Sequence, residues 1–98
     1  MTTYSSRADV ATERPERYAK QLVSHLGHKL EFTKNGATAT AIVAGTVASI
    51  TTKEDVLVLE VNGTDPEGVA RAEDALASHL VRFGDKDELA VSWQRTSS

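Results

Sequence analysis

The most regular hydrophobic pattern in the chain lies in residues Thr12–Lys29, TERPERYAKQLVSHLGHK. Here Tyr18, Leu22 and Leu26 recur every four residues, which places them on one face of an α-helix. The first residue of the stretch is a suitable N-cap, and Pro15 falls in the first turn, where its missing N–H costs little. The pattern therefore predicts a helix over 12–29 that packs through a single apolar stripe.

A second helix is predicted between Asp65 and Phe83. Asp65 is a favourable N-cap, Pro66 suits the first helical position, and Gly84 is a typical residue to follow the last turn. The apolar positions of this segment again have helical spacing. Five of them form the predicted buried stripe: Val69, Ala72, Leu76, Leu80 and Phe83.

Three further segments have the composition and period of β-strands. Leu30–Lys34 and Leu89–Gln94 alternate apolar and polar residues, and Val56–Val61 is apolar on both faces apart from Glu60. In Leu89–Gln94 the predicted inward residues are Leu89, Val91 and Trp93. Each segment is short, as expected for strands of a small domain.

The segment Ala37–Lys53 is rich in Ala and Thr and has Gly45 near its middle. A central glycine marks a bulge, a bend or a tight turn, so this segment is either one bent strand or two short strands. The preceding Asn35-Gly36 pair is a signal for a two-residue hairpin. Near the N-terminus, Ala8–Ala11 is predicted to be a short edge strand.

These elements predict a single domain over residues 1–98, with loose tails at residues 1–7 and 96–98. Consecutive hairpins favour an antiparallel sheet, and one apolar stripe on each helix places both helices on the same side of it. The predicted fold is therefore an α+β two-layer sandwich, with a mainly antiparallel sheet of four to five strands and two helices on one face.

Composition narrows the function classes. The net charge is -3, without the basic field on which nucleic-acid binding depends, and no apolar run is long enough to cross a membrane. There is no cysteine, so thiolate chemistry is excluded and a cytoplasmic location is expected. No nucleophile elbow, phosphate loop or dinucleotide fingerprint is present. The expectation is a protein that is not an enzyme and has no cofactor.

The three histidines are the main candidates for chemistry. His25 and His28 share a flank of the first helix, and His79 borders the apolar stripe of the second. If the helices pack side by side, three imidazoles converge, and such a set binds transition metals. The bland alternative is that each histidine bonds a nearby backbone carbonyl. Gln21 lies on the same flank and completes the candidate surface.

Two aromatic residues and the second face of the sheet are weaker candidates. Tyr18 and Trp93 are either core residues or ligand-stacking residues, and their apolar positions favour the core. The apolar second face of Val56–Val61 predicts an interface for a homodimer. The alternative is a sheet face that is rich in Thr and exposed to water.

Two motifs resemble a known family. Residues Thr12–Lys29 fit T-x-R-P-x-R-Y-x-K-Q-L-x-S-H-x-G-H-K, with one residue more before Pro15 than a T-x-P start would have. The sequence L-V-L-E-V is followed by H-L-x-R-F-G-x-x-D-E-L-x-V-x-W over His79–Trp93. Together they resemble the bacterial domain of unknown function 2218 (DUF2218) family. The motif positions here are Arg17, Tyr18, Gln21, His25, His28, Lys29, His79, Arg82, Phe83 and Trp93.

The resemblance implies an accessory role in iron or siderophore handling, because family members occur fused to, or encoded beside, siderophore-interacting flavin reductases. The chain has no flavin-binding domain, so it is not expected to be a reductase by itself. Three hypotheses follow, in order of preference. They are a small binding or accessory domain, a structural domain that forms homo-oligomers, and a metal-dependent enzyme built on the histidines.

Overall fold

The structure is a computed structural model that describes residues 2–83 and 89–97, and for Phe83 the backbone alone. In chain order the elements are β1 (Tyr4–Ala11), α1 (Pro15–Leu26), β2 (Thr33–Asn35), β3 (Thr38–Val43), β4 (Thr46–Lys53), β5 (Val56–Gly63), α2 (Pro66–Phe83) and β6 (Gln94–Ser97). The strands form one sheet in the order β2-β3-β4-β5-β1-β6. Every pairing in it is antiparallel.

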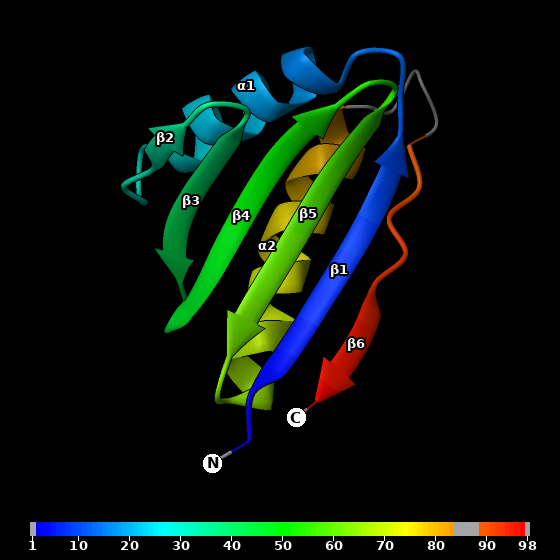
Figure 1. Cartoon of the computed structure of the whole chain (residues 1–98). Coiled ribbons are helices and arrows are strands. Elements are labelled where there is room, and N and C mark those ends of the chain that lie inside the picture. Colours follow the sequence, from blue (N-terminus) through cyan, green and yellow to red (C-terminus); the bar gives the residue numbers. More distant parts are fainter. Residues whose placement is uncertain (1, 84–88, 98) are drawn as a thin grey trace.

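Both helices lie on the same side of the sheet (Figure 1). α2 runs behind the centre of the sheet and contacts β5, β1 and β4, whereas α1 contacts β4, β5 and α2. The α+β two-layer prediction is confirmed, with six strands in place of four to five. No helix among the described residues is long and apolar enough to cross a membrane.

β1 corrects the prediction for the N-terminus. The strand begins at Tyr4, pairs along its whole length with β5, and lies between β5 and β6. It is therefore neither a short edge strand nor preceded by a loose tail up to residue 7. Its side chains alternate between the two faces of the sheet. Ser6, Ala8 and Val10 are buried under the helices, and Arg7 is exposed on the other face.

The segment Ala37–Lys53 consists of two strands joined by a tight turn. Val43 pairs with Thr46, and the two residues between them, Ala44 and Gly45, have φ angles of 50° and 76°. Two positive φ angles are typical of a type I′ hairpin turn, which matches the twist of its strands. The hairpin predicted at Asn35-Gly36 also forms, one residue later, because Asn35 already pairs with Thr38.

The two edge strands lie further along the chain than predicted. β2 begins at Thr33, and β6 begins at Gln94 and includes most of the predicted C-terminal tail. The predicted inward residues still pack against the core from the segments before these strands. They are Leu30, Phe32, Leu89, Val91 and Trp93. Alternation correctly indicated burial there, but the paired backbone lies elsewhere.

The helices match the predicted stripes closely. α1 buries Tyr18, Leu22 and Leu26, and it ends three residues before the predicted end at Lys29. The α2 stripe is fully buried at Val69, Ala72, Leu76 and Leu80, whereas the Phe83 side chain and Gly84 lie outside the described residues. The caps differ. Asp65 accepts a hydrogen bond from the Glu67 N–H at 3.1 Å, as predicted. The N-cap position of α1 is Arg14 rather than Thr12, without a side-chain cap.

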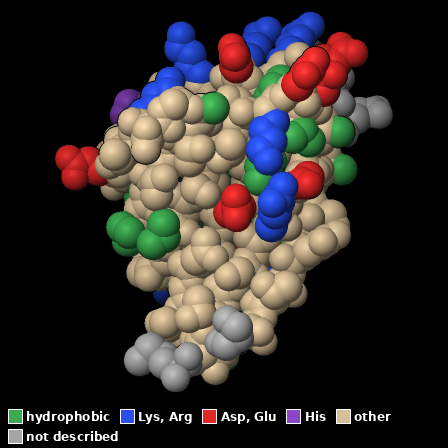
Figure 2. All heavy atoms as spheres, viewed as in Figure 1, with side chains coloured by type: hydrophobic (Ala, Val, Ile, Leu, Met, Phe, Trp, Pro, Cys, Tyr) green, Lys and Arg blue, Asp and Glu red, His purple; other side chains and the backbone are tan. Residues whose placement is uncertain are grey.

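The face of the sheet away from the helices is mostly polar (Figure 2). Its side chains come mainly from Ser and Thr positions of β3 and β4 and from the exposed Arg7–Asp9 ion pair of β1, at 2.8 Å. Ile42 and Val47 are large apolar residues exposed on this face. They face each other across β3 and β4, with exposed fractions of 62% and 43%. Val58 lies on the same face but is 2% exposed.

Candidate functional site

Helix α1 has two flanks that face different surroundings. Residues turn by about 100° per position along a helix, so Gln21 and His25 share one flank while Ala19 and Val23 share the other. The ridge between the flanks carries Lys20 and a serine, Ser24. The histidine flank borders a shallow pocket of about 350 Å³. Its lining residues are Lys20, Gln21, Ser24, His25 and His28.

Two of the three predicted imidazoles converge. The ring centroids of His25 and His79 are 4.8 Å apart, with the ring planes tilted by 50°. This contact follows from the side-by-side packing of α1 and α2, which the sequence alone left open. The predicted flank is thus composed of side chains from both helices.

A backbone hydrogen bond fixes the tautomer of His79. Its Nδ1 lies 2.7 Å from the carbonyl oxygen of Ala75, one helical turn earlier. A carbonyl only accepts hydrogen bonds, so Nδ1 carries the proton and the neutral ring has its acceptor lone pair at Nε2. This is the bland role expected for a helix-edge histidine, and it is also the arrangement that orients imidazoles in ligand sites.

His28 lies in the turn after α1 and lines the pocket together with His25. Within residues 2–83 and 89–97, no group of three or more His, Cys, Asp or Glu side chains is arranged to hold a metal ion. The three-histidine metal site therefore stays a prediction. Its two closest members, His25 and His79, form a pair rather than a triad.

Gln21 has an unusual environment for an amide. Its Oε1 atom is buried and has no hydrogen-bond partner. An unpaired buried acceptor costs roughly 1–3 kcal/mol, and because this oxygen is shielded from solvent it is not a direct contact for a ligand in the open pocket. The pocket also contains the Lys20 ammonium and no carboxylate among its lining residues. Its accessible chemistry is that of polar side chains and one positive charge.

The two aromatic candidates lie outside this pocket. Tyr18 is 5% exposed and belongs to the core cluster, and Trp93 is half-buried against the same core. Both placements agree with the packing interpretation. Lys20 and Ser24 line the pocket but were not predicted as site residues, because they point away from the apolar stripe. The available signal was the spacing of Ser24, three residues after Gln21 and four before His28, and of Lys20, four residues before Ser24.

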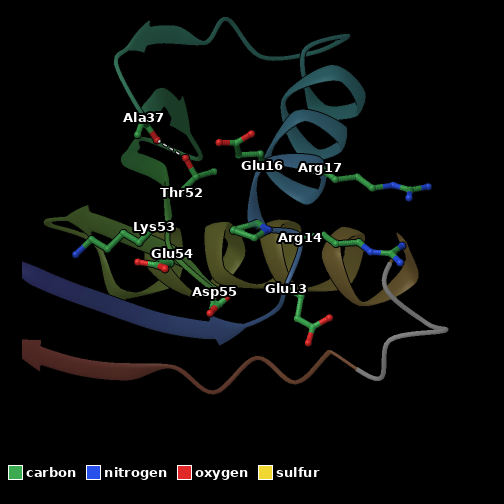
Figure 3. Close-up of a pocket in the computed structure, with 10 residues that line it drawn as sticks. Glu13, Arg14, Glu16, Arg17, Ala37, Thr52, Lys53, Glu54 and Asp55 are labelled. Atoms are coloured by element: carbon green, nitrogen blue, oxygen red, sulfur yellow. Dashed lines mark hydrogen bonds between the residues drawn. The ribbon is translucent and has the colours of Figure 1, made fainter.

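A second hollow, of about 620 Å³, lies at the start of α1 beside the β4–β5 turn (Figure 3). Its lining residues carry charges of both signs, including the carboxylates of Glu13 and Glu54 and the cations of Arg14 and Lys53. In Figure 3 the Arg14 and Lys53 side chains point in opposite directions. Side chains that diverge in this way do not present a common set of groups to a ligand.

Comparison with known proteins places the chain in a family. Residues 7–94 match the family model described as "Uncharacterized protein conserved in bacteria (DUF2218)". The chain belongs to the DUF2218 family. The match covers nearly the whole chain, and it confirms the resemblance based on the Thr12–Lys29 and His79–Trp93 motifs.

A solved structure has the same fold as the DUF2218 chain. The structure titled "NMR structure of PA4090 from Pseudomonas aeruginosa" is similar over 96% of each chain, with a TM-score of 0.73 and 24% identity. The "De novo designed protein Foldit4" aligns over 97% of this chain and 94% of its own at 13% identity, and its TM-score of 0.41 is too low to show a shared fold. No curated protein sequence matches the chain.

Proposed function

We propose that this DUF2218 chain is a small binding domain that holds an anionic ligand on the histidine flank of α1. The observation that carries the proposal is the approach of His25 and His79 to 4.8 Å beside the pocket of Gln21. Helices hold side chains more precisely than loops do, so a site shared by two packed helices is well suited to binding.

The chemistry of the flank favours an anion. Lys20 contributes a positive charge, and the His25 imidazole at the edge of the pocket can donate a hydrogen bond to an oxygen atom. The His79 N–H is donated to Ala75, so the His79 ring acts by positioning His25. The pocket is open and shallow, so it suits a ligand that is held by one side and is not enclosed. An anionic iron chelate has this chemistry, since its outer oxygen atoms are acceptors. The family resemblance supports the same class of ligand.

The proposed cellular role is accessory to a siderophore-interacting flavin reductase, as the resemblance implies. In that role the domain presents the chelate while the reductase supplies the redox chemistry. The cytoplasmic location belongs to the same proposal, because flavin reductases of this kind use intracellular reductants. In this proposal the chain binds the chelate and contributes no catalytic residue.

The proposal is tested by NMR titration of the isolated chain with diamagnetic Ga³⁺ chelates, one tris-catecholate and one tris-hydroxamate. We expect shifts of the Gln21 side-chain amide and of the His25 and His79 ring signals on addition of a chelate. His25→Gln should weaken binding by about tenfold, which is the loss expected for one hydrogen bond to a charged partner. His79→Gln should weaken binding less, because the His79 N–H is donated to Ala75 and its ring acts by positioning His25. Arg71→Gln, on the exposed side of α2, is the control that leaves binding unchanged.

Two results count against this function. One is the absence of shifts with both chelates, and the other is binding by the histidine variants with wild-type affinity. Zn²⁺ added to the same labelled protein tests the metal hypothesis separately, because coordination shifts the ring nitrogens far more than a hydrogen bond does. A pull-down with the flavin reductase as bait tests the partner.

A second candidate function is self-association through the open face of the sheet. The exposed Ile42 and Val47 pair is the observation that favours it. A homodimer through this face leaves the histidine flank on the outside, because the flank lies on the helix side of the sheet. The two functions are therefore compatible in one molecule.

A further inference from the structure

A groove of about 680 Å³ lies on the other flank of α1, between this helix and strands β2, β3 and β4. Its walls include Ala19 and Val23 of α1, and its floor includes Ala39 and Ile50 of the sheet. The floor residues are buried, with exposed fractions of 5% and 1%. The groove therefore has an apolar interior that solvent reaches from its open side.

Small residues account for the space. Gly36, Ala37 and Ala39 carry little or no side chain where β2 and β3 face the helix layer. A Cβ atom placed on Gly36 would meet nothing within 4 Å. α1 packs against β4 and β5, so the sheet extends beyond the helix toward β2. Two helices thus cover six strands incompletely, and the uncovered part is the groove.

The rim of the groove is mainly positive. Lys20 borders it from the ridge of α1, and Lys34 borders it from β2 on the opposite side. Within the described part of the chain neither ammonium group forms an ion pair. Glu16, near the start of α1, is the one carboxylate that lines the groove. Two cations across an apolar floor match a ligand that has an apolar body and an anionic head.

We propose that this groove binds a small amphipathic carboxylate of medium-chain length. The volume falls within the range of about 300–1,000 Å³ that is usual for small-molecule sites. The apolar chain lies against Ala19, Val23 and Ile50, and the carboxylate lies between Lys20 and Lys34. The groove shares Lys20 and Ser24 with the pocket of the histidine flank but lies on the other side of α1, and the proposal does not depend on the proposed function.

The test uses sodium decanoate and, as a cation of equal chain length, decyltrimethylammonium, each titrated into ¹⁵N-labelled protein. We expect decanoate to shift the amide signals of Ala19, Val23 and Ala39, and the cation to bind more weakly. Lys34→Glu should weaken decanoate binding about three- to tenfold, as expected for reversing one exposed charge. Lys53→Glu, which places the same charge change on the open face of the sheet, should leave the affinity unchanged.

A second variant separates the apolar contact from the charge. Ala19→Leu fills the groove and should abolish the decanoate shifts, whereas Ala77→Leu, at a comparably half-buried position of α2, should not. The amide spectrum of each variant shows whether it is folded. Equal affinity for the cation, shifts confined to other residues, or wild-type binding by folded Ala19→Leu would each overturn the proposal. Ga³⁺ chelate binding in the Lys34→Glu variant should be normal, which keeps the two sites distinguishable.

Discussion

Glu73 is 7% exposed on α2 and is held by partners from both ends of the chain. It accepts a hydrogen bond from the Ser6 hydroxyl of β1 and two from the Arg95 guanidinium of β6, one of them at 2.9 Å. The hydrogen bonds from Arg95 are the largest cause that lowers the pKa of Glu73, burial acts in the opposite direction, and Ser6 lowers the pKa further. This carboxylate therefore connects the helix to two strands.

Arg95→Met should destabilise the protein at neutral pH by about 1–2 kcal/mol, because it leaves a buried carboxylate with Ser6 alone. The value is modest because the Arg95 side chain is half exposed to solvent, which screens the pair. Arg7→Met is a matched control, since it removes an ion pair that is exposed on both sides. It should cost clearly less than Arg95→Met, because solvent screens both partners.

The pH dependence gives this prediction a second measurement. A lowered pKa in the folded state means that the stabilisation is present above the ordinary value of 4.5 and is lost as the pH falls through the folded value. The difference in unfolding free energy between wild type and Arg95→Met should therefore shrink from pH 7 to pH 3 in urea titrations. A difference that is constant with pH, or equal to that of Arg7→Met, would contradict the prediction.

Some of these side-chain positions follow from the sequence, and their partners do not. The position of Glu73 near the apolar stripe of α2 was predictable from helical spacing. Its partners were not, because Ser6 and Arg95 are 67 and 22 residues away and lie in or next to segments predicted to be loose. Similarly, the spacing of His25 and His28 placed them on one flank, but only helix packing brings His79 to His25. Contacts between distant segments leave no local pattern.

Among the elements, the start of α2 packs unusually closely against the β3–β4 turn. A Cβ atom on Gly68 would lie 2.6 Å from the carbonyl oxygen of Ala44. The obstacle is backbone, so it yields only if the helix or the turn moves. This contact explains why a glycine occupies the first turns of a helix, where it is otherwise unfavourable.

Gly68→Ala should therefore destabilise the protein by about 1–3 kcal/mol, the usual cost of overpacking. At an exposed helical position the same change stabilises by up to about 1 kcal/mol, so the sign of the effect distinguishes the two cases. Ser78→Ala, on the exposed side of α2, is the control and should change stability little. Thermal and urea unfolding of both variants provide the measurement, and a more stable Gly68→Ala would refute the close contact.

Element types were predictable from the sequence more reliably than element bounds. Both helices have strong periodic patterns and appear as expected. The pattern of Ala37–Lys53 left open whether it forms one bent strand or two, and the structure has two. β1 was underestimated because Ser6 interrupts the apolar alternation, although its hydroxyl is satisfied by Glu73. β6 follows the apolar positions Leu89–Trp93 in the chain. Its four residues are all exposed and pair through the backbone with β1, so no hydrophobic pattern marks this strand. A hydrophobic pattern indicates which side chains are buried, whereas the backbone pairing of an edge strand requires little side-chain burial.

In the whole molecule, both helices cover one face of the sheet and leave the other face open. Ile42 and Val47 form a small exposed apolar patch on a mostly polar face. A patch of two side chains supports only a weak interface, so we expect a homodimer that dissociates on dilution. Sedimentation equilibrium should show a mass that rises toward twice 10.5 kDa with concentration.

The same measurement on variants locates the interface. Ile42→Lys should give a monomer at every concentration, because the dimer would bury two unpaired charges in its centre. Ala11→Lys adds a charge at an exposed position on the far side of the same face and should leave the dimer intact. A dimer that survives Ile42→Lys would shift the interface to an unpaired sheet edge, such as the outer side of β6. A wild-type chain that stays monomeric at high concentration would exclude self-association and leave the polar, water-exposed face as the correct interpretation.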